Sequence, residues 1–169
     1  MDTFEILSQL CSAAGVSGAE GSAAETAAKL LEKYGKTTLD NALGSVVCKV
    51  GDWESGKPVM LLDAHIDEIG MIVTYITEDG FLKISGCGGL DTRLLLAQQV
   101  TVYGREKLTG VVTSTPPHLE KDSSDAPDLD SVFIDIGFTS RENAAKYVSL
   151  GDRVLIENKA ERLAGSRVT

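Results

Sequence analysis

Hydrophobic positions in the first part of the chain follow the spacing of two helices. Apolar residues recur every three or four positions between residues 4 and 14, and Gly15 supplies a stop. A second helix is predicted over residues 22–34, with Ser22 as its N-cap and Glu25 completing a capping box. The spacing of three to four residues in both segments predicts amphipathic helices, each with one apolar face.

Short apolar runs then follow, with lengths typical of strands. Strands are predicted at Leu39, at residues 46–50 (VVCKV) and at residues 59–62 (VMLL), and residues 51–57 between the last two resemble a hairpin loop. The run at 59–62 suits a strand buried in a sheet. Helices followed by strands predict the opening of an α/β layered domain.

The pattern changes after Gly70. Residues 71–77 alternate and are rich in β-branched side chains, and Asp79–Gly80 is a strong hairpin signal. Further strands are predicted at residues 81–84, 100–103, 108–113, 132–136, 154–157 and 163–168, with one short helix at 141–148. Many short strands at close spacing predict a small β-barrel or β-sandwich.

The fold class is therefore α/β, with a β-rich domain inserted into a larger one. We place the first part of the α/β domain at residues 1–69, the inserted domain at 70–163, and the return to the first domain at 164–169. Two helices and three strands form a sheet too small to bury both faces. This predicts that the chain is the front half of a longer protein.

Composition narrows the partners and the compartment. The net charge is −9 and Lys and Arg form no stripe, which argues against nucleic acid. No apolar run approaches the roughly 20 residues that span a bilayer, and acidic residues stand where a signal peptide would be basic. A cytoplasmic protein with no membrane or nucleic-acid partner is expected. The three cysteines are widely spaced and are predicted to be reduced, packed thiols.

The chemistry is concentrated where the apolar run at 59–62 ends. His65 is one of two histidines, and Asp67 follows it at a spacing that places both side chains on one side of an extended chain. An imidazole whose second nitrogen is held by a carboxylate is a common metal ligand. A structural, hydrogen-bonded histidine is the alternative. Asp63 could help to shape the site, and Glu68 could be a ligand, an acid–base group or a turn residue.

Two other segments are weaker candidates. His118 lies in a proline-rigid segment, TPPHL, where a structural or subunit-contact role is favoured over metal binding. Residues 86–89 (GCGG) lack the Lys–Ser/Thr pair of a phosphate-binding loop and are interpreted as a flexible connection between strands. The acidic stretch at 121–130 fails the EF-hand pattern and is interpreted as a solvated loop.

Several motifs together resemble one enzyme family. AHIDEIG at residues 64–70 resembles the AHxDEIG signature of the M42 co-catalytic metallo-aminopeptidases, which include tetrahedral, glutamyl and deblocking aminopeptidases. Some members carry the older name endoglucanase. GVSGAE at 15–20, GVVTSTPPHL at 110–119, VFIDIGFTSRENA at 132–144 and GDRV at 151–154 agree in the same order. The resemblance covers essentially the whole chain.

The resemblance implies a fold, an activity and site residues. It implies a metallopeptidase-type α/β domain that carries two divalent ions, zinc or cobalt, and hydrolyses N-terminal residues from short peptides with a metal-activated water. It further implies an inserted domain that mediates dimerisation, with possible assembly into dodecamers. His65 is then the ligand of one metal ion, and Asp67 is the catalytic carboxylate that orients it. Family members are roughly twice as long, so the remaining ligands and the general base are expected beyond Thr169.

Two other functions stay open at this stage. The chain could be a non-catalytic module that self-associates through its β-rich domain. The older family name also suggests a glycan hydrolase, which would need two carboxylates about 5–10 Å apart across a sugar site. With aromatic residues at 5%, the sequence shows no aromatic-rich groove for a sugar, and this reading ranks last.

Overall fold

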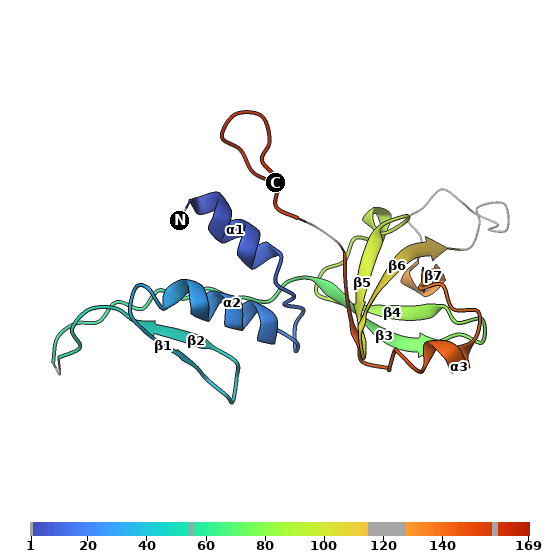
Figure 1. Cartoon of the computed structure of the whole chain (residues 1–169), viewed down its shortest axis with the longest axis horizontal. Coiled ribbons are helices and arrows are strands. Elements are labelled where there is room, and N and C mark those ends of the chain that lie inside the picture. The colour runs from blue at the N-terminus through green and yellow to red at the C-terminus, as the bar shows by residue number, and fades with distance from the viewer. Residues whose placement is uncertain (1, 55, 115–127, 157–158) are drawn as a thin grey trace. The chain divides into compact units, whose positions relative to one another are not determined.

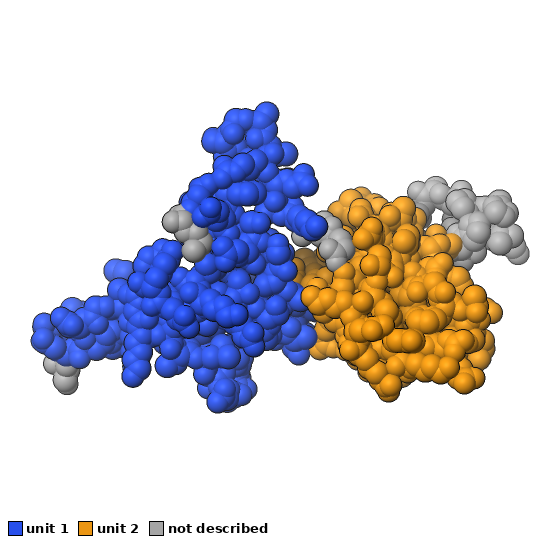
Figure 2. Space-filling model, viewed as in Figure 1, with its two compact units in different colours: residues 1–67, 158–169 blue, residues 68–157 orange. Residues whose placement is uncertain are grey.

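The computed structural model describes residues 2–54, 56–114, 128–156 and 159–169. The chain divides into two compact units, residues 1–67 with 158–169 and residues 68–157 (Figures 1 and 2). The boundaries predicted from the sequence are 69/70 and 163/164. In the structure, residues 68 and 69 group with the second unit and residues 158–163 with the first.

The first unit contains two helices and a two-stranded sheet. Helices α1 (Thr3–Cys11) and α2 (Gly21–Leu31) precede strands β1 (Lys36–Leu39) and β2 (Val46–Lys49), which pair antiparallel. Helix α2 packs against both strands and against α1 (Figure 1). Its inward face carries alanine, so the backbones approach closely, and Ala23 and Ala24 are buried.

The two helices begin in different ways. Asp2 caps α1, because its carboxylate accepts the Phe4 N–H while the Glu5 carboxylate accepts the Asp2 N–H. The prediction of Ser22 as N-cap of α2 is wrong. The Ala24 N–H already donates to the Glu20 carbonyl, so the helix starts at Gly21 and no side chain caps it.

Protonation of Asp2 should loosen α1. A hydrogen bond from Arg162, helped by the Phe4 N–H, lowers the pKa of Asp2 from its ordinary value of 3.8. The ionised carboxylate therefore stabilises the folded helix above about pH 4, and this contribution is lost as the pH falls through the lowered pKa. We expect the ¹³Cα shifts of α1 to move towards random-coil values in this acid range. An Asp2→Asn variant should lack that step; an identical step in the variant would contradict the assignment.

The segment after β2 corrects the predicted strand at residues 59–62. Its side chains are exposed, at 61% for Val59, 84% for Met60, 83% for Leu61 and 87% for Leu62. A strand requires a hydrogen-bonded neighbour, and within the described residues β2 pairs with β1 alone. The segment is extended but unpaired, and residues 51–57 are consequently not a hairpin loop.

The second unit is a closed antiparallel barrel, which confirms the predicted small β-rich fold. Its described strands are β3 (Gly70–Ile76), β4 (Leu82–Cys87), β5 (Gln99–Tyr103), β6 (Lys107–Ser114), β7 (Val132–Asp135) and β8 (Arg153–Ile156). They follow the order β3-β4-β7-β6-β5-β8, and β8 pairs with β3 to close the barrel (Figure 1). Closure pairs both edges of every strand and removes the exposed edges of an open sheet.

Alternation along the strands fills the barrel interior. The core consists of aliphatic side chains from all six strands, with Leu95, Ala144 and Val148 from the connections: Met71, Val73, Ile76, Leu82, Ile84, Val100, Val102, Val112, Val132, Ile134 and Val154. The predicted hairpin between β3 and β4 is present. Gly80 has a φ of 88° there, which a side chain would strain.

The connections between the barrel strands contain short helices. The described residues include two 3₁₀ helices, η1 (Thr92–Leu94) and η3 (Leu129–Ser131), and a one-turn helix α3 (Arg141–Ala144), half the predicted length. Residues 163–168 do not form the predicted strand: Arg162 and Val168 form one isolated antiparallel bridge.

None of the described helices is long and apolar enough to cross a membrane. The three cysteines form no disulfide among the described residues. Cys48 and Cys87 are partly buried, whereas Cys11 is exposed on α1 and is therefore not the packed thiol that was predicted.

Candidate metal-ligand site

The imidazole of His65 is exposed and is held through one of its two nitrogens. Nδ1 lies 3.0 Å from Oδ1 of Asp67 and 3.1 Å from the Asp67 backbone carbonyl. The His65 side chain is 86% exposed. Since both acceptors face Nδ1, that nitrogen carries the proton in the neutral ring and Nε2 carries the lone pair. This is the tautomer in which Nε2 can bind a metal ion.

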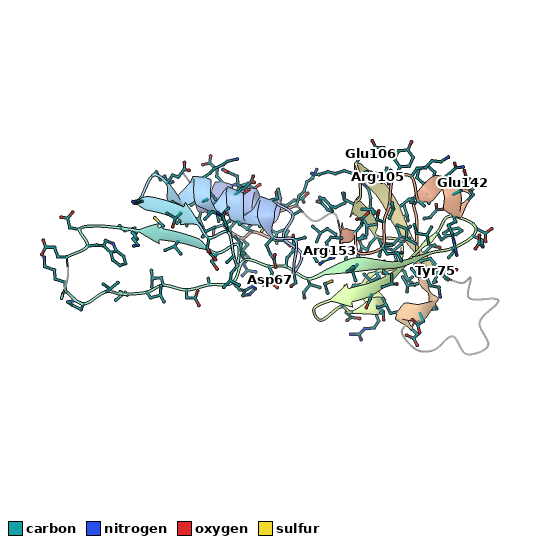
Figure 3. The ribbon with its side chains drawn as sticks, turned by 90° about the horizontal axis from the view of Figure 1, so that it is seen from below. Asp67, Tyr75, Arg105, Glu106, Glu142 and Arg153 are labelled. Atoms are coloured by element: carbon teal, nitrogen blue, oxygen red, sulfur yellow. The ribbon has the colours of Figure 1, made fainter. Side chains whose placement is uncertain are left out.

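Asp67 is held from both sides. Its Oδ1 faces His65, and its Oδ2 accepts a hydrogen bond from the hydroxyl of Ser17, fifty positions earlier in the sequence. The Ser17 hydrogen bond, followed by that of His65, lowers the pKa of the Asp67 carboxyl below its ordinary value. Asp67 is therefore ionised at neutral pH and accepts a hydrogen bond from the imidazole. Figure 3 shows it at the end of the extended segment.

Ser17 is placed by the tight turn between α1 and α2. The Ala19 N–H donates to the Val16 carbonyl at 2.7 Å, and Gly18 has a φ of 80°. A positive φ at the third position is the mark of a type II turn, with Ser17 at the second position. Val16 is 1% exposed and anchors the turn in the core of the first unit.

The described residues bring His65 and Asp67 together. Within the described ranges, no group of three or more His, Cys, Asp and Glu side chains could hold a metal ion. Asp63, which was expected to help to shape the site, is exposed. Glu68 falls in the second unit. The residues present fit one imidazole ligand with its orienting carboxylate, and no more.

The weaker candidates have separate outcomes. His118 lies outside the described residues. Residues 86–89 include the end of β4 and lead towards η1, and Gly88 has a φ of 93° with the Ile69 side chain against it. That geometry fits a connection between strands. The acidic stretch 121–130 is described only from Asp128, which caps η3.

Sequence reasoning missed Ser17 as part of the site. The motif GVSGAE was recognised only as one of the segments that carry the family resemblance. A hydroxyl at the second position of a turn gives no local signal for a partner so distant in the sequence. Its presence in the same motif set as the AHIDEIG segment was the one available indication.

Comparisons with known proteins identify the family. The sequence profile of M42 glutamyl aminopeptidases matches residues 44–169. The chain is 30% identical over 149 residues to the lysyl aminopeptidase of Pyrococcus furiosus, covering 85% of this chain and 42% of that protein. The structure superimposes with a TM-score of 0.88 on the aminopeptidase APDkam598 of Desulfurococcus kamchatkensis, at 31% identity, covering 98% of this chain and 46% of the other.

A further solved structure shows the same fold. The TET1 peptidase of Pyrococcus horikoshii, which can assemble into a tetrahedron or a large octahedral shell, matches with a TM-score of 0.84 at 30% identity. That match covers 96% of this chain and 49% of the peptidase. The chain thus spans less than half the length of the relatives described here. With the profile matching most of its residues, the chain belongs to the M42 glutamyl aminopeptidase family.

Proposed function

We propose that this chain is the N-terminal part of a metal-dependent aminopeptidase that hydrolyses N-terminal residues from short peptides. The observation that supports this most directly is the His65–Asp67 pair, in which an exposed imidazole presents Nε2 while a carboxylate holds Nδ1. A ligand prepared in this way is typical of catalytic metal sites. Membership of a family of aminopeptidases supplies the reaction class.

In this proposal His65 binds one of two divalent ions, zinc or cobalt. Two such ions, when bound, supply a Lewis acid for the scissile carbonyl and lower the pKa of a water molecule. Asp67 keeps the imidazole in the Nδ1-protonated tautomer and fixes the ring orientation. The remaining ligands and the general base would belong to the part of the relatives that this chain does not cover. The described residues contain no group of three or more possible metal ligands.

The same proposal assigns roles to the two parts of the chain. The first unit, residues 1–67 and 158–169, would belong to the peptidase domain, and the second unit, residues 68–157, would form the inserted dimerisation domain. No strand edge of the described barrel is left to pair, so self-association through this domain would use its side-chain surface. Assembly of a relative into closed shells supports a homo-oligomer. A cytoplasmic location stays a prediction from the sequence.

Chelation tests the proposal. The protein expressed from its complete gene should release chromophore from aminoacyl chromogenic substrates, lose at least about 90% of that rate after treatment with a chelator, and recover it with zinc or cobalt. Activity that persists in chelator would contradict a metal-dependent mechanism. The same assay with carboxymethyl-cellulose as substrate distinguishes the glycan-hydrolase alternative.

A non-catalytic self-association module is the second candidate. It is favoured by one observation, the absence of a complete ligand set within the described residues. Analytical ultracentrifugation of this 169-residue chain, combined with the assay above, separates the two. A stable dimer from a gene whose full product neither binds metal nor hydrolyses peptides would favour the module.

A further inference from the structure

The contact between Ser17 and Asp67 joins two segments that the sequence separates by fifty positions. Ser17 lies in the turn between α1 and α2, and its hydroxyl donates to the carboxylate that holds His65. The two oxygens of Asp67 have different partners, Oδ2 with the Ser17 hydroxyl and Oδ1 with the imidazole. Ser17 therefore fixes the orientation of the carboxylate through Oδ2, which leaves Oδ1 to accept the hydrogen bond from His65.

Asp67 needs such support because it is not enclosed. Its side chain is 42% exposed, and the segment that carries it is extended and unpaired over residues 58–67. Water can compete for a carboxylate in that position, and the backbone around it supplies no sheet to hold it. Ser17 in contrast is half-buried in a turn fixed by the buried Val16 and the left-handed Gly18.

We propose that Ser17 is a positioning residue for the metal ligand: its hydroxyl orients the Asp67 carboxylate, which in turn holds His65 with Nε2 free for a divalent ion. The inference rests on the proposed function for the identity of the ligand, although the Ser17–Asp67–His65 chain of contacts does not depend on it. Ser17 touches neither metal nor substrate in this arrangement. It acts through Asp67.

The expected consequence is a change in the imidazole before any metal is added. With Ser17 replaced by Ala, the carboxylate turns towards water and its bond to Nδ1 weakens, so the proton moves in part to Nε2. Protonation of Nε2 blocks the nitrogen that binds the metal. Changes in the groups that orient a ligand typically lower metal affinity about 10–100-fold, and we expect the lower end because Ser17 acts at one remove.

The experiment measures the His65 tautomer in the 169-residue chain by ¹⁵N NMR at about pH 8.5, where a free imidazole is neutral. All variants also carry His118→Gln, so that His65 is the one remaining histidine. Ser17→Ala should shift Nδ1 towards the unprotonated value, and Ser17→Thr, which keeps the hydroxyl, should restore the wild-type shift. Ser22→Ala, the same substitution on the exposed surface of α2, should change nothing.

The outcomes separate this inference from the proposed function. An unchanged His65 spectrum in Ser17→Ala overturns the inference, as does an equal shift in Ser17→Thr. If Ser17→Ala does not fold, Ser17→Cys replaces the hydroxyl by a weak donor of similar size and is read in the same way. In the protein from the complete gene, Ser17→Ala should weaken zinc binding about 10-fold. A tautomer shift in a protein whose activity resists chelation would uphold the inference and refute the metallopeptidase function.

Discussion

Replacing His65 by Gln should lower kcat/KM of the protein expressed from its complete gene by more than about 100-fold. Loss of a group that merely orients a ligand costs up to about 100-fold, and loss of the ligand itself should exceed that. Gln keeps a polar side chain of similar length, but its amide is a poor ligand for zinc or cobalt. Rates on aminoacyl chromogenic substrates and the bound metal per subunit should fall together.

The control for this variant is His118→Gln, the same change at the chain's other histidine. It should retain both activity and metal, because the sequence favours a structural or subunit-contact role for His118. Full activity of His65→Gln with two metal ions still bound would remove His65 from the centre. A loss of activity with both ions retained would assign His65 a role other than ligation.

The second unit was predictable from the sequence because its signals are local. Alternation over residues 71–77 and the Asp79–Gly80 turn identify a hairpin without any information from elsewhere. The structure places β3 and β4 there, paired antiparallel from Gly70 with Cys87 to Ile76 with Leu82, with a register shift between Val73 and Tyr75. Closure of the barrel was less accessible, because β8 must pair with both β3 and β5 across long stretches of sequence.

The first unit shows where local reasoning fails. The run at residues 59–62 has the composition of a buried strand, yet whether it becomes one depends on neighbours that the run does not encode. No described strand pairs with it, and its side chains are 61–87% exposed. Exposed apolar surface of this extent is characteristic of an interaction site or an incomplete core.

The candidate site divides in the same way. The His65–Asp67 contact was predictable, since a spacing of two residues brings side chains together in an extended chain. The Ser17–Asp67 contact was not, because it depends on how α1, α2 and the extended segment fold onto one another. The helix cap illustrates a third case. Ser22 and Glu25 satisfy the capping-box pattern, but the helix that follows the turn at Gly18 already begins at Gly21, so Ser22 lies inside it.

Replacing Gly104 by Ala should destabilise the barrel by about 3 kcal/mol, the upper end for adding a methyl group to a packed site. Its Cβ would lie 2.3 Å from the Tyr147 carbonyl oxygen, which accepts the Arg105 N–H at 2.8 Å, so the backbone must move and that bond weakens. Figure 3 labels Arg105 in the barrel.

The Gly104 measurement is urea unfolding followed by tyrosine near-ultraviolet dichroism, because three of the four tyrosines belong to the barrel unit, and the midpoint should fall. The fluorescence of Trp53, the single tryptophan, reports the first unit and should keep its midpoint. Gly89→Ala is the matched control: its Cβ meets no atom within 4 Å, so its effect should stay within about 0.5 kcal/mol. Equal stability of the two variants would show that the Tyr147 segment moves aside freely, and that this corner of the barrel is not close-packed.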